Sequence, residues 1–233
     1  MTRGTAAQRE LDVFALVGRT LAGKYRVDAA VARGARTTVY RAVHAAWHQP
    51  VAIRCLRLDD AAEPAEREAR VDAFFDEARR MAELSARTAG VAQGRDMGRV
   101  RVGGRDVPFI VVEWLDGAPL ADVLANERAR GLAPRTLEAA IALLDPVAEA
   151  LALLGEAGRA AEHVSTHSLF VVGDPRGGDC VVKLVDLGGG ASQGDASALA
   201  RVLAEVLGGA WPSQPAASRP AVTAAPRSSP SAV

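Results

Sequence analysis

The chain has 233 residues, and 28 Lys or Arg residues are balanced by 28 Asp or Glu residues, so its formal net charge is zero. This length allows one medium domain or two small lobes, and the balanced charge gives no overall attraction to nucleic acid. No stretch approaches the roughly 20 apolar residues needed to span a bilayer, and the first residues do not resemble a secretory signal. We therefore expect a cytoplasmic protein without a membrane span, in which Cys55 and Cys180 are inert core thiols.

After a lead-in of 22 residues, the first half of the chain has the pattern of an antiparallel sheet. Three segments within residues 25–58 are rich in Val, Ile, Thr and Tyr and are separated by turn or polar residues, which is typical of a strand meander. Residues 97–115 add a hairpin whose turn holds Gly103 and Gly104. The sequence therefore predicts five strands in this half.

Helical patterns follow these strands. Within residues 71–84, apolar residues recur at helical spacing, which predicts one helix, whereas the polar residues just before them predict a loop. Further helices are expected at residues 119–130, 137–157 and 195–209, and Pro146 should kink or split the middle one. Two short strands, joined by a turn rich in Gly, Asp and Pro, precede the last helix.

The order of these parts resembles a known family. A β-rich lobe, a strand that leads into helices, and a strand–turn–strand ending in Asp186-Leu187-Gly188 resemble the fold of bacterial eukaryotic-like serine/threonine protein kinases. The resemblance runs from about Tyr25 to Gly209 and implies an α+β, kinase-like fold of two lobes, with a five-stranded antiparallel N-lobe sheet and a reduced helical C-lobe. The expected parts are a lead-in at 1–22, the N-lobe at 23–115, the C-lobe at 116–209 and a disordered Pro/Ala/Ser-rich tail at 210–233.

The segment VARGARTTVYRA resembles the kinase Gly-rich loop, in which glycines let the backbone approach the phosphates of ATP closely. Gly34 and Val39 match the family pattern and are expected to border the nucleotide, whereas Ala32 and Thr37 replace the outer glycines. An ordinary β-hairpin with no nucleotide role remains the alternative interpretation.

The segment VAIRCL resembles the V-A-I-K strand, with Ala52 in the nucleotide pocket and Arg54 in place of the phosphate-binding Lys. Arg keeps the charge but has a planar, bulkier head group, and it should pair with Glu77 at the family's helix-C position. The alternative is that Arg54 reflects a general use of Arg, since Lys24 and Lys183 are the only lysines in the sequence.

The segment PFIVVEWLDG resembles the strand and hinge that hold adenine. Val112 takes the gatekeeper position, and the resemblance implies that backbone groups of Glu113 and Leu115 hydrogen-bond the base. Phe170, on the strand after the catalytic loop, is assigned to the same nucleotide pocket.

The segment AEHVSTHSLFVV resembles the catalytic loop, but its chemical residues are replaced. His163 stands at the position of the catalytic Asp, and Ser168 stands at that of the magnesium-binding Asn. Asp186 of the Asp-Leu-Gly triplet keeps the other magnesium-binding position. His163 is either a working base, since the unperturbed pKa of His is near 6.5, or a plain loop residue.

These losses indicate a pseudokinase, a non-catalytic module that acts in signalling or regulation through an unknown protein partner. Only residues 189–194 separate the Asp-Leu-Gly triplet from the last helix, so most of the kinase activation segment is missing. Residual ATP binding with weak or no dependence on magnesium is expected. The alternatives are a weak or atypical phosphotransferase that uses Asp186, Arg54 and His163, and a decayed kinase without a role.

The C-lobe offers a candidate surface for self-association. With fewer helices around it, the last helix is expected to leave Ala198 and the flank of Val206 uncovered, and an exposed apolar patch often marks a binding surface. In the alternative, small Ala residues let the lobe close over itself.

Overall fold

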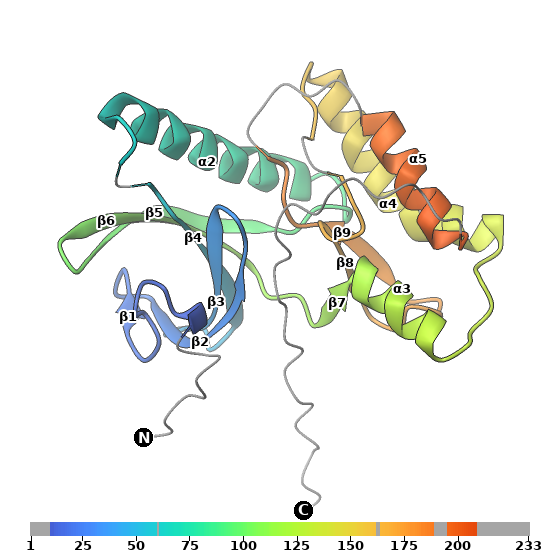
Figure 1. The fold of residues 1–233 in the computed structure, drawn as a ribbon, viewed down its shortest axis with the longest axis horizontal. Coiled ribbons are helices and arrows are strands. Elements are labelled where there is room, and N and C mark those ends of the chain that lie inside the picture. Colours follow the sequence, from blue (N-terminus) through green and yellow to red (C-terminus); the bar gives the residue numbers. More distant parts are fainter. Residues whose placement is uncertain (1–9, 60, 162–163, 189–194, 209–233) are drawn as a thin grey trace, which may run out of the picture.

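The computed structural model describes residues 10–59, 61–161, 164–188 and 195–208. Within these ranges the chain has one lobe dominated by a six-stranded sheet and a second, mainly helical lobe, and Figure 1 shows them on either side of the label β7. The expected α+β fold of two lobes is therefore confirmed. The expected tail at 210–233 and the short segment 189–194 lie outside the described residues.

The large sheet has six strands rather than the expected five, and all its neighbouring strands are antiparallel. The additional strand comes from the lead-in, where Thr20 and Leu21 pair with Arg26 and Tyr25. A strand of two residues is too short to show the alternation from which strands are predicted. In their order across the sheet, the strands are β1 (Thr20–Leu21), β2 (Tyr25–Arg33), β3 (Thr37–His44), β4 (Pro50–Leu56), β6 (Arg105–Glu113) and β5 (Gly94–Val102).

The two faces of the large sheet carry different groups, because successive side chains of a strand point to opposite sides. On β4, Val51, Ile53 and Cys55 are at most 1% exposed and pack into the core of the N-lobe. Between them, Ala52 packs against the core of the helical lobe, and Arg54 bonds to groups outside the sheet. The alternation thus places Arg54 between the two lobes.

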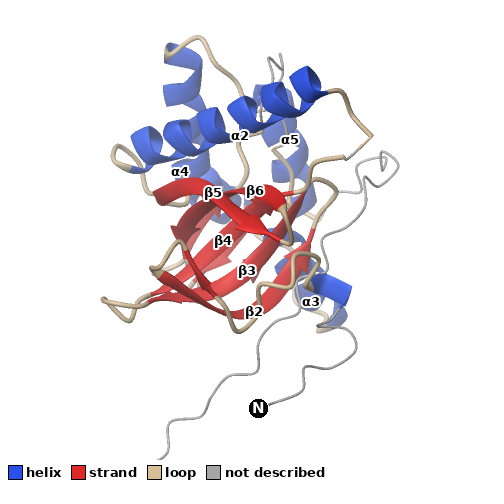
Figure 2. Ribbon diagram, turned by 90° about the vertical axis from the view of Figure 1, so that its left-hand side faces the viewer, coloured by secondary structure: helices blue, strands red, loops and turns tan. Residues whose placement is uncertain are grey.

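Helix α2 (Pro64–Ser85) lies across the large sheet, as Figure 2 shows. It begins seven residues before Val71, so the expected loop in this segment is wrong. Pro64 occupies the first turn, where its fixed φ suits a helix, and the Ala, Glu and Arg residues that follow are good helix formers. An ion pair of 2.6 Å between Arg70 and Glu66 adds to the stability of this turn.

The helical lobe contains the three expected helices and a small antiparallel sheet of three strands. Strand β7 was not expected, and glycine is required in it because a Cβ atom on Gly117 would lie 1.9 Å from the carbonyl oxygen of Val171. The helices are α3 (Leu120–Ala129), α4 (Leu137–Glu156) and α5 (Asp195–Val206). The strands, in sheet order, are β7 (Gly117–Pro119), β8 (Leu169–Val172) and β9 (Val181–Leu184).

Pro146 lies inside α4, and of the two expected outcomes, a kink or a split, the split does not occur. The ring removes one backbone hydrogen bond, but buried apolar residues on both sides, including Leu143 and Val147, hold the helix against the core. The chain after α2 also packs closely here, because a Cβ atom on Gly90 would lie 1.8 Å from the carbonyl oxygen of Pro146. Tertiary packing therefore keeps α4 continuous across Pro146, although proline inside a helix tends to break it.

Helix α5 packs beside α4 at the edge of the helical lobe (Figure 1). Ala198 and Val206, which were expected to be uncovered, are only 8% and 2% exposed. That expectation is wrong, and the alternative in which this part of the lobe closes over itself is correct for α5. The large apolar side chains that are exposed in this lobe lie before α4 or within its first five residues; they are Leu132, Leu137 and Ile141. Throughout the described ranges, no helix is long and apolar enough to cross a membrane.

Candidate functional site

Arg54 connects the sheet to both α2 and the strand end that carries Asp186. Its Nη1 atom donates to Glu77 Oε1 at 2.6 Å and to the Val185 carbonyl at 3.1 Å, and its Nη2 atom lies 3.3 Å from Asp186 Oδ2. The side chains of Arg54 and Glu77 are 9% and 6% exposed, whereas that of Asp186 is 38% exposed. The predicted ion pair between Arg54 and Glu77 is confirmed. We call Arg54, Glu77 and Asp186 the Arg54 cluster.

Helix α2 also holds the Asp-Leu-Gly triplet in place. Glu77 Oε1 accepts a long hydrogen bond from the Leu187 backbone N–H at 3.4 Å. One turn further along the same face, Arg80 donates to the Gly188 carbonyl at 2.6 Å. The Gly188 N–H donates to Asp186 Oδ1 at 3.0 Å, so both carboxylate oxygens of Asp186 have a partner.

The charges of the Arg54 cluster respond differently to their surroundings. Burial would lower the pKa of Arg54, but the two carboxylates outweigh it and raise that pKa, so the guanidinium stays charged. Burial raises the pKa of Glu77 and outweighs the opposing effect of Arg54. For Asp186, burial would raise the pKa, but Arg54 and the Gly188 N–H together lower it. Asp186 is therefore the more firmly ionised of the two carboxyl groups.

The turn between β2 and β3, which corresponds to the Gly-rich loop, is fastened to the end of β4. The Gly34 N–H donates to the Thr37 carbonyl at 2.8 Å, and Arg57 Nη2 donates to the carbonyls of Gly34, at 2.8 Å, and Ala35. The Arg57 backbone N–H donates to the Arg36 carbonyl at 2.8 Å. A Cβ atom on Gly34 would come no closer than 3.6 Å to its neighbours, so packing within the chain does not require this glycine.

Val39 and Ala52 lie on the same face of the large sheet as Arg54. Val39 is directly opposite Arg54 on the neighbouring strand, and Ala52 is two residues before it. Both are partly exposed. The structure therefore brings these two expected pocket residues together with the Arg54 cluster.

The hinge residue Glu113 has contacts that the sequence did not predict. Its backbone N–H donates to the Gln93 carbonyl at 2.9 Å, and its carboxylate accepts from the Gln93 N–H at 2.8 Å and from Lys183 Nζ at 2.5 Å. Lys183 lies on β9 directly opposite Phe170 on β8. Leu115, the other hinge residue, packs partly buried against the core of the helical lobe. Glu113 therefore ties the hinge to the small sheet.

Ser168 does not face outward as a metal ligand would. It is 9% exposed, and its hydroxyl accepts from the Ser165 N–H at 3.0 Å and donates to the Ser165 carbonyl at 3.1 Å. Ala161, which replaces the first residue of the catalytic motif, is 2% exposed. His163 lies outside the described residues.

The residues present do not fit magnesium well. Mg²⁺ prefers an octahedron of oxygen ligands that includes carboxylates, and it gives up water reluctantly. Asp186 is already paired with Arg54, and the Ser168 hydroxyl is neutral and used within its own turn. In the part of the chain that is described, no group of three or more His, Cys, Asp or Glu side chains is placed to hold a metal ion.

The sequence is similar to those of bacterial serine/threonine protein kinases. The chain is 30% identical over 190 residues to a probable serine/threonine-protein kinase of Streptomyces coelicolor, covering 82% of this chain and 26% of that protein. It is 33% identical over 170 residues to the serine/threonine-protein kinase PknL of Mycobacterium tuberculosis, covering 72% of this chain and 37% of PknL. The chain belongs to the bacterial eukaryotic-like serine/threonine kinase family. No protein-family model matches the sequence.

This kinase-family chain spans between about a quarter and two fifths of the length of these relatives. The similarity covers 72% to 82% of this chain, enough to include most of both lobes. Family membership accounts for the order of the strands and helices.

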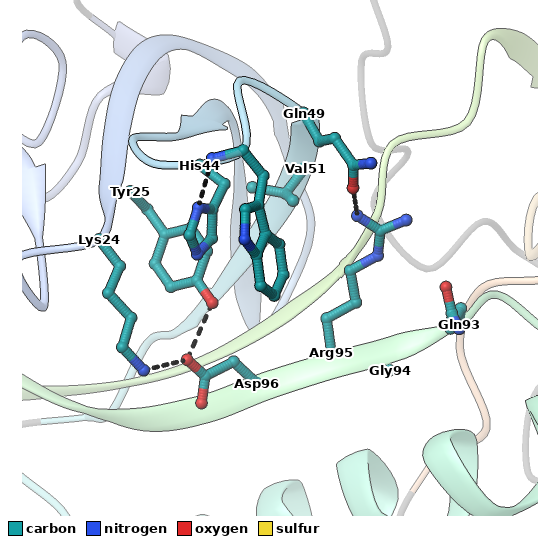
Figure 3. A pocket seen from close by; sticks show the side chains of 10 residues that line it. Lys24, Tyr25, His44, Gln49, Val51, Gln93, Gly94, Arg95 and Asp96 are labelled. Atoms are coloured by element: carbon teal, nitrogen blue, oxygen red, sulfur yellow. Dashed lines mark hydrogen bonds and ion pairs between the residues drawn. The ribbon is translucent and has the colours of Figure 1, made fainter.

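A separate pocket of about 690 Å³ lies on the other face of the kinase-like sheet (Figure 3). Val51, which points away from Arg54, is one of its lining residues. Figure 3 shows Asp96 beside Lys24 and Tyr25, from which it accepts hydrogen bonds of 3.2 and 2.8 Å. No residue of the Arg54 cluster lines this pocket, so the two sites are distinct.

Sequence reasoning missed a second buried ion cluster, in the helical lobe. Glu127 on α3 takes two hydrogen bonds from Arg135, at 2.6 and 2.7 Å, and lies 3.2 Å from Arg176 Nε. Arg135 also donates to the Pro175 carbonyl at 3.0 Å, and Arg176 to the Ala133 carbonyl at 2.8 Å. Burial would raise the pKa of Glu127, but the two guanidinium groups lower it. We call Glu127, Arg135 and Arg176 the Glu127 cluster. Its members come from separate segments of the chain, so no periodic sequence pattern predicts it.

Proposed function

We propose that this chain is a pseudokinase domain, which binds a protein partner in signalling or regulation and does not itself transfer phosphate. The observation that carries the proposal is the pairing of Asp186 with Arg54, at 3.3 Å between Oδ2 and Nη2. In the kinase reaction this Asp binds magnesium, which neutralises the charge that develops on the phosphates. Here the Arg54 side chain lies beside the Asp186 carboxylate, where the kinase reaction has a magnesium ion.

The surroundings of Ser168 support the same conclusion. A kinase needs a second metal ligand at this position and an anionic base nearby that accepts the proton of the substrate hydroxyl. Ser168 is buried, and its hydroxyl closes a turn with Ser165. The sequence has His163 at the position of the base. Catalytic groups that act together cannot be replaced by one of them, so Asp186 alone is not sufficient for phosphate transfer.

A weak or atypical phosphotransferase is the second candidate. The observation in its favour is that Asp186 is 38% exposed and has a lowered pKa, so an ionised carboxylate remains within reach of a ligand. In this candidate Asp186 holds the metal, Arg54 contacts the phosphates and His163 accepts the proton.

A phosphate-transfer assay separates the two candidates. Purified protein is incubated with radiolabelled ATP and either Mg²⁺ or Mn²⁺, with itself and with a generic protein as acceptors. We expect no incorporation above that of the Asp186→Ala variant, which removes the remaining metal ligand. Transfer by the wild type that is lost in Asp186→Ala would overturn the proposal and support the phosphotransferase.

A further inference from the structure

We propose that the pocket beside the turn between β3 and β4 binds a small aromatic carboxylate, whose ring stacks on Trp47 and whose carboxylate pairs with Arg95. The volume of this pocket, about 690 Å³, lies within the usual range of small-molecule sites, roughly 300–1,000 Å³. Because no residue of the Arg54 cluster lines the pocket, the inference goes beyond the pseudokinase proposal and does not rest on it.

Trp47 offers a ligand a flat apolar surface. It is 70% exposed, the largest exposed fraction among the large apolar residues of the described ranges. Its indole ring stacks on the His44 ring, with the centroids 4.4 Å apart and the planes 12° apart, so His44 covers one face of the indole. A planar ring that stacks on the other face would remove apolar surface of both partners from water and would gain the additional attraction of an aromatic pair.

The His44 ring, which supports the indole, is itself held from two sides. Its Nδ1 atom accepts hydrogen bonds from the backbone N–H groups of Ala46 and Trp47, both at 3.3 Å. Its ring packs edge-on against Tyr25 at a centroid distance of 5.3 Å, and the Tyr25 hydroxyl donates to Asp96 at 2.8 Å. The stacking surface is therefore fixed to strand β5, and a site that is already ordered loses less conformational entropy when it binds.

A β-bulge positions Arg95 at the pocket. Gly94 pairs with Val112 and Asp96 pairs with Val111, so Arg95 is the extra residue between two pairs of the β5–β6 ladder. Bulges change the direction of a side chain and occur frequently next to functional sites. The bulge leaves Arg95 without a paired residue on β6, and its side chain lines the pocket.

The guanidinium of Arg95 has donors left for a ligand. Gln49 Oε1 accepts a hydrogen bond from Arg95 Nη1 at 3.2 Å, and Figure 3 shows the two side chains pointing toward one another. Because Gln49 follows Trp47 by two residues, the guanidinium lies beside the turn that carries the indole. Within the described part of the chain, no carboxylate pairs with Arg95. Its other N–H groups can hold a carboxylate through two parallel hydrogen bonds.

The charges that line the pocket favour an anion. Lys24 and Arg95 are positive, and Asp96 is the single carboxylate among the lining residues, so these groups leave one positive charge. Burial would raise the pKa of Asp96, but hydrogen bonds from Tyr25 and Lys24 lower it, so this carboxylate is ionised and already has partners. An aromatic cation could also stack on an indole, but the net positive charge would repel it.

Binding is tested by calorimetry and thermal shift with the full chain and three probes. Naphthoate has a planar ring and a carboxylate, naphthamide keeps the ring without the charge, and cyclohexanecarboxylate keeps the charge without the aromatic ring. We expect naphthoate to bind about tenfold more tightly than either of the other two, because only naphthoate uses both Trp47 and Arg95. Naphthamide or cyclohexanecarboxylate bound as tightly as naphthoate would overturn the inference.

Two variants of equal charge loss on the same strand give the matched control. Arg95→Gln should weaken naphthoate binding about tenfold and leave naphthamide binding unchanged, because naphthamide has no charge to pair. Arg101→Gln changes an exposed position further along β5, roughly 20 Å away, and should leave both unchanged. Trp47→Ala should weaken the binding of both aromatic probes. The melting temperature of each variant without probe verifies its folding.

No binding of naphthoate, equal affinities of Arg95→Gln and Arg101→Gln, or binding that Trp47→Ala does not weaken would each overturn the inference. Light scattering of the same samples tests another occupant of the site. A dimer that Trp47→Ala dissociates, together with no binding of naphthoate, would assign the exposed indole to a second copy of the chain and would also overturn it. The phosphate-transfer assay does not depend on any of these outcomes.

Discussion

The Arg54 cluster and the Glu127 cluster are built from the same groups in opposite proportion. The first places one arginine between two carboxylates, and the second places one carboxylate between two arginines. Both contain nearly buried members, yet the pKa of Glu77 is raised and that of Glu127 is lowered. At Glu77 burial outweighs the single arginine, whereas at Glu127 two arginines outweigh burial, so burial and neighbouring charge together decide how firmly each carboxylate is ionised.

Removal of Glu127 should have the largest effect on stability. Glu127→Leu leaves Arg135, whose side chain is 6% exposed, without its carboxylate, and a guanidinium cannot lose its proton to escape the cost. We expect the free energy of unfolding to fall by about 3–5 kcal/mol, as for other broken buried ion pairs. Urea denaturation measures the change. A loss no larger than that of Glu138→Leu, an exposed position on α4, would show that the cluster is not structurally important.

Removal of Arg54 should cost less, at the lower end of the same range, about 3 kcal/mol. Arg54→Met leaves two carboxylates together, but Glu77 already has a raised pKa and can take up a proton, and Asp186 is partly exposed. The variant should therefore recover part of its stability as the pH falls toward 5. If Arg54→Met is as damaging as Glu127→Leu at every pH, protonation of Glu77 does not relieve the cost.

The two clusters should differ in the sign of their dependence on pH. Because the pKa of Glu127 is lowered in the fold, its ionisation stabilises the protein above the unfolded-state pKa of about 4.3, and this stability is lost as the pH falls through the folded pKa. The pKa of Glu77 is raised, so its contribution is fully present below about 4.3 and is lost as the pH rises through the folded pKa.

Melting curves between pH 3 and 8 test this difference in the variants Glu127→Gln and Glu77→Gln. The stability gap between wild type and Glu127→Gln should widen as the pH rises from the acid end. The gap between wild type and Glu77→Gln should narrow as the pH rises above about 4.3. Gaps that move in the same direction would contradict the comparison between the clusters.

The smallest effect is expected at the rim of the Glu127 cluster. Arg176 is 38% exposed and lies 3.2 Å from the carboxylate, and partly exposed ion pairs contribute little. Arg176→Gln should lower the free energy of unfolding by at most about 1 kcal/mol. Arg135→Gln is the matched variant at the buried position, and it should cost clearly more. Equal losses would mean that exposure does not separate the two arginines.

The sequence predicted the Arg54–Glu77 pair but neither its contact with Asp186 nor the Glu127 cluster, and the reason is physical. Arg54 and Glu77 occupy positions fixed by the order of landmarks in a known fold, so their meeting followed from the resemblance. Arg135 and Arg176 reach Glu127 from a loop and from the turn between β8 and β9. Such contacts depend on tertiary packing, and no short-range pattern in the sequence predicts them.

The same distinction holds for the fold. The five longer strands of the large sheet were predicted because each spans enough residues to show a strand-like composition or to flank a recognisable hairpin turn. Strand β1 and strand β7 were missed, since two and three residues carry no pattern. The early start of α2 was missed because polar residues at 64–70 were taken as a loop, although a polar first turn that begins with Pro64 is compatible with a helix.

Each lobe contains one cysteine whose alkylation can report local unfolding of that lobe. Cys55 on β4 is fully buried, and burial raises the pKa of its thiol to about 12, so thiol reagents reach it only when the sheet opens. Cys180 is partly exposed and packs against the core of the helical lobe. The rate at which Cys55 is alkylated therefore reports local unfolding of the N-lobe, with Cys180 as the faster internal reference. Ligands that close the space near Arg54 should slow the first reaction and leave the second unchanged.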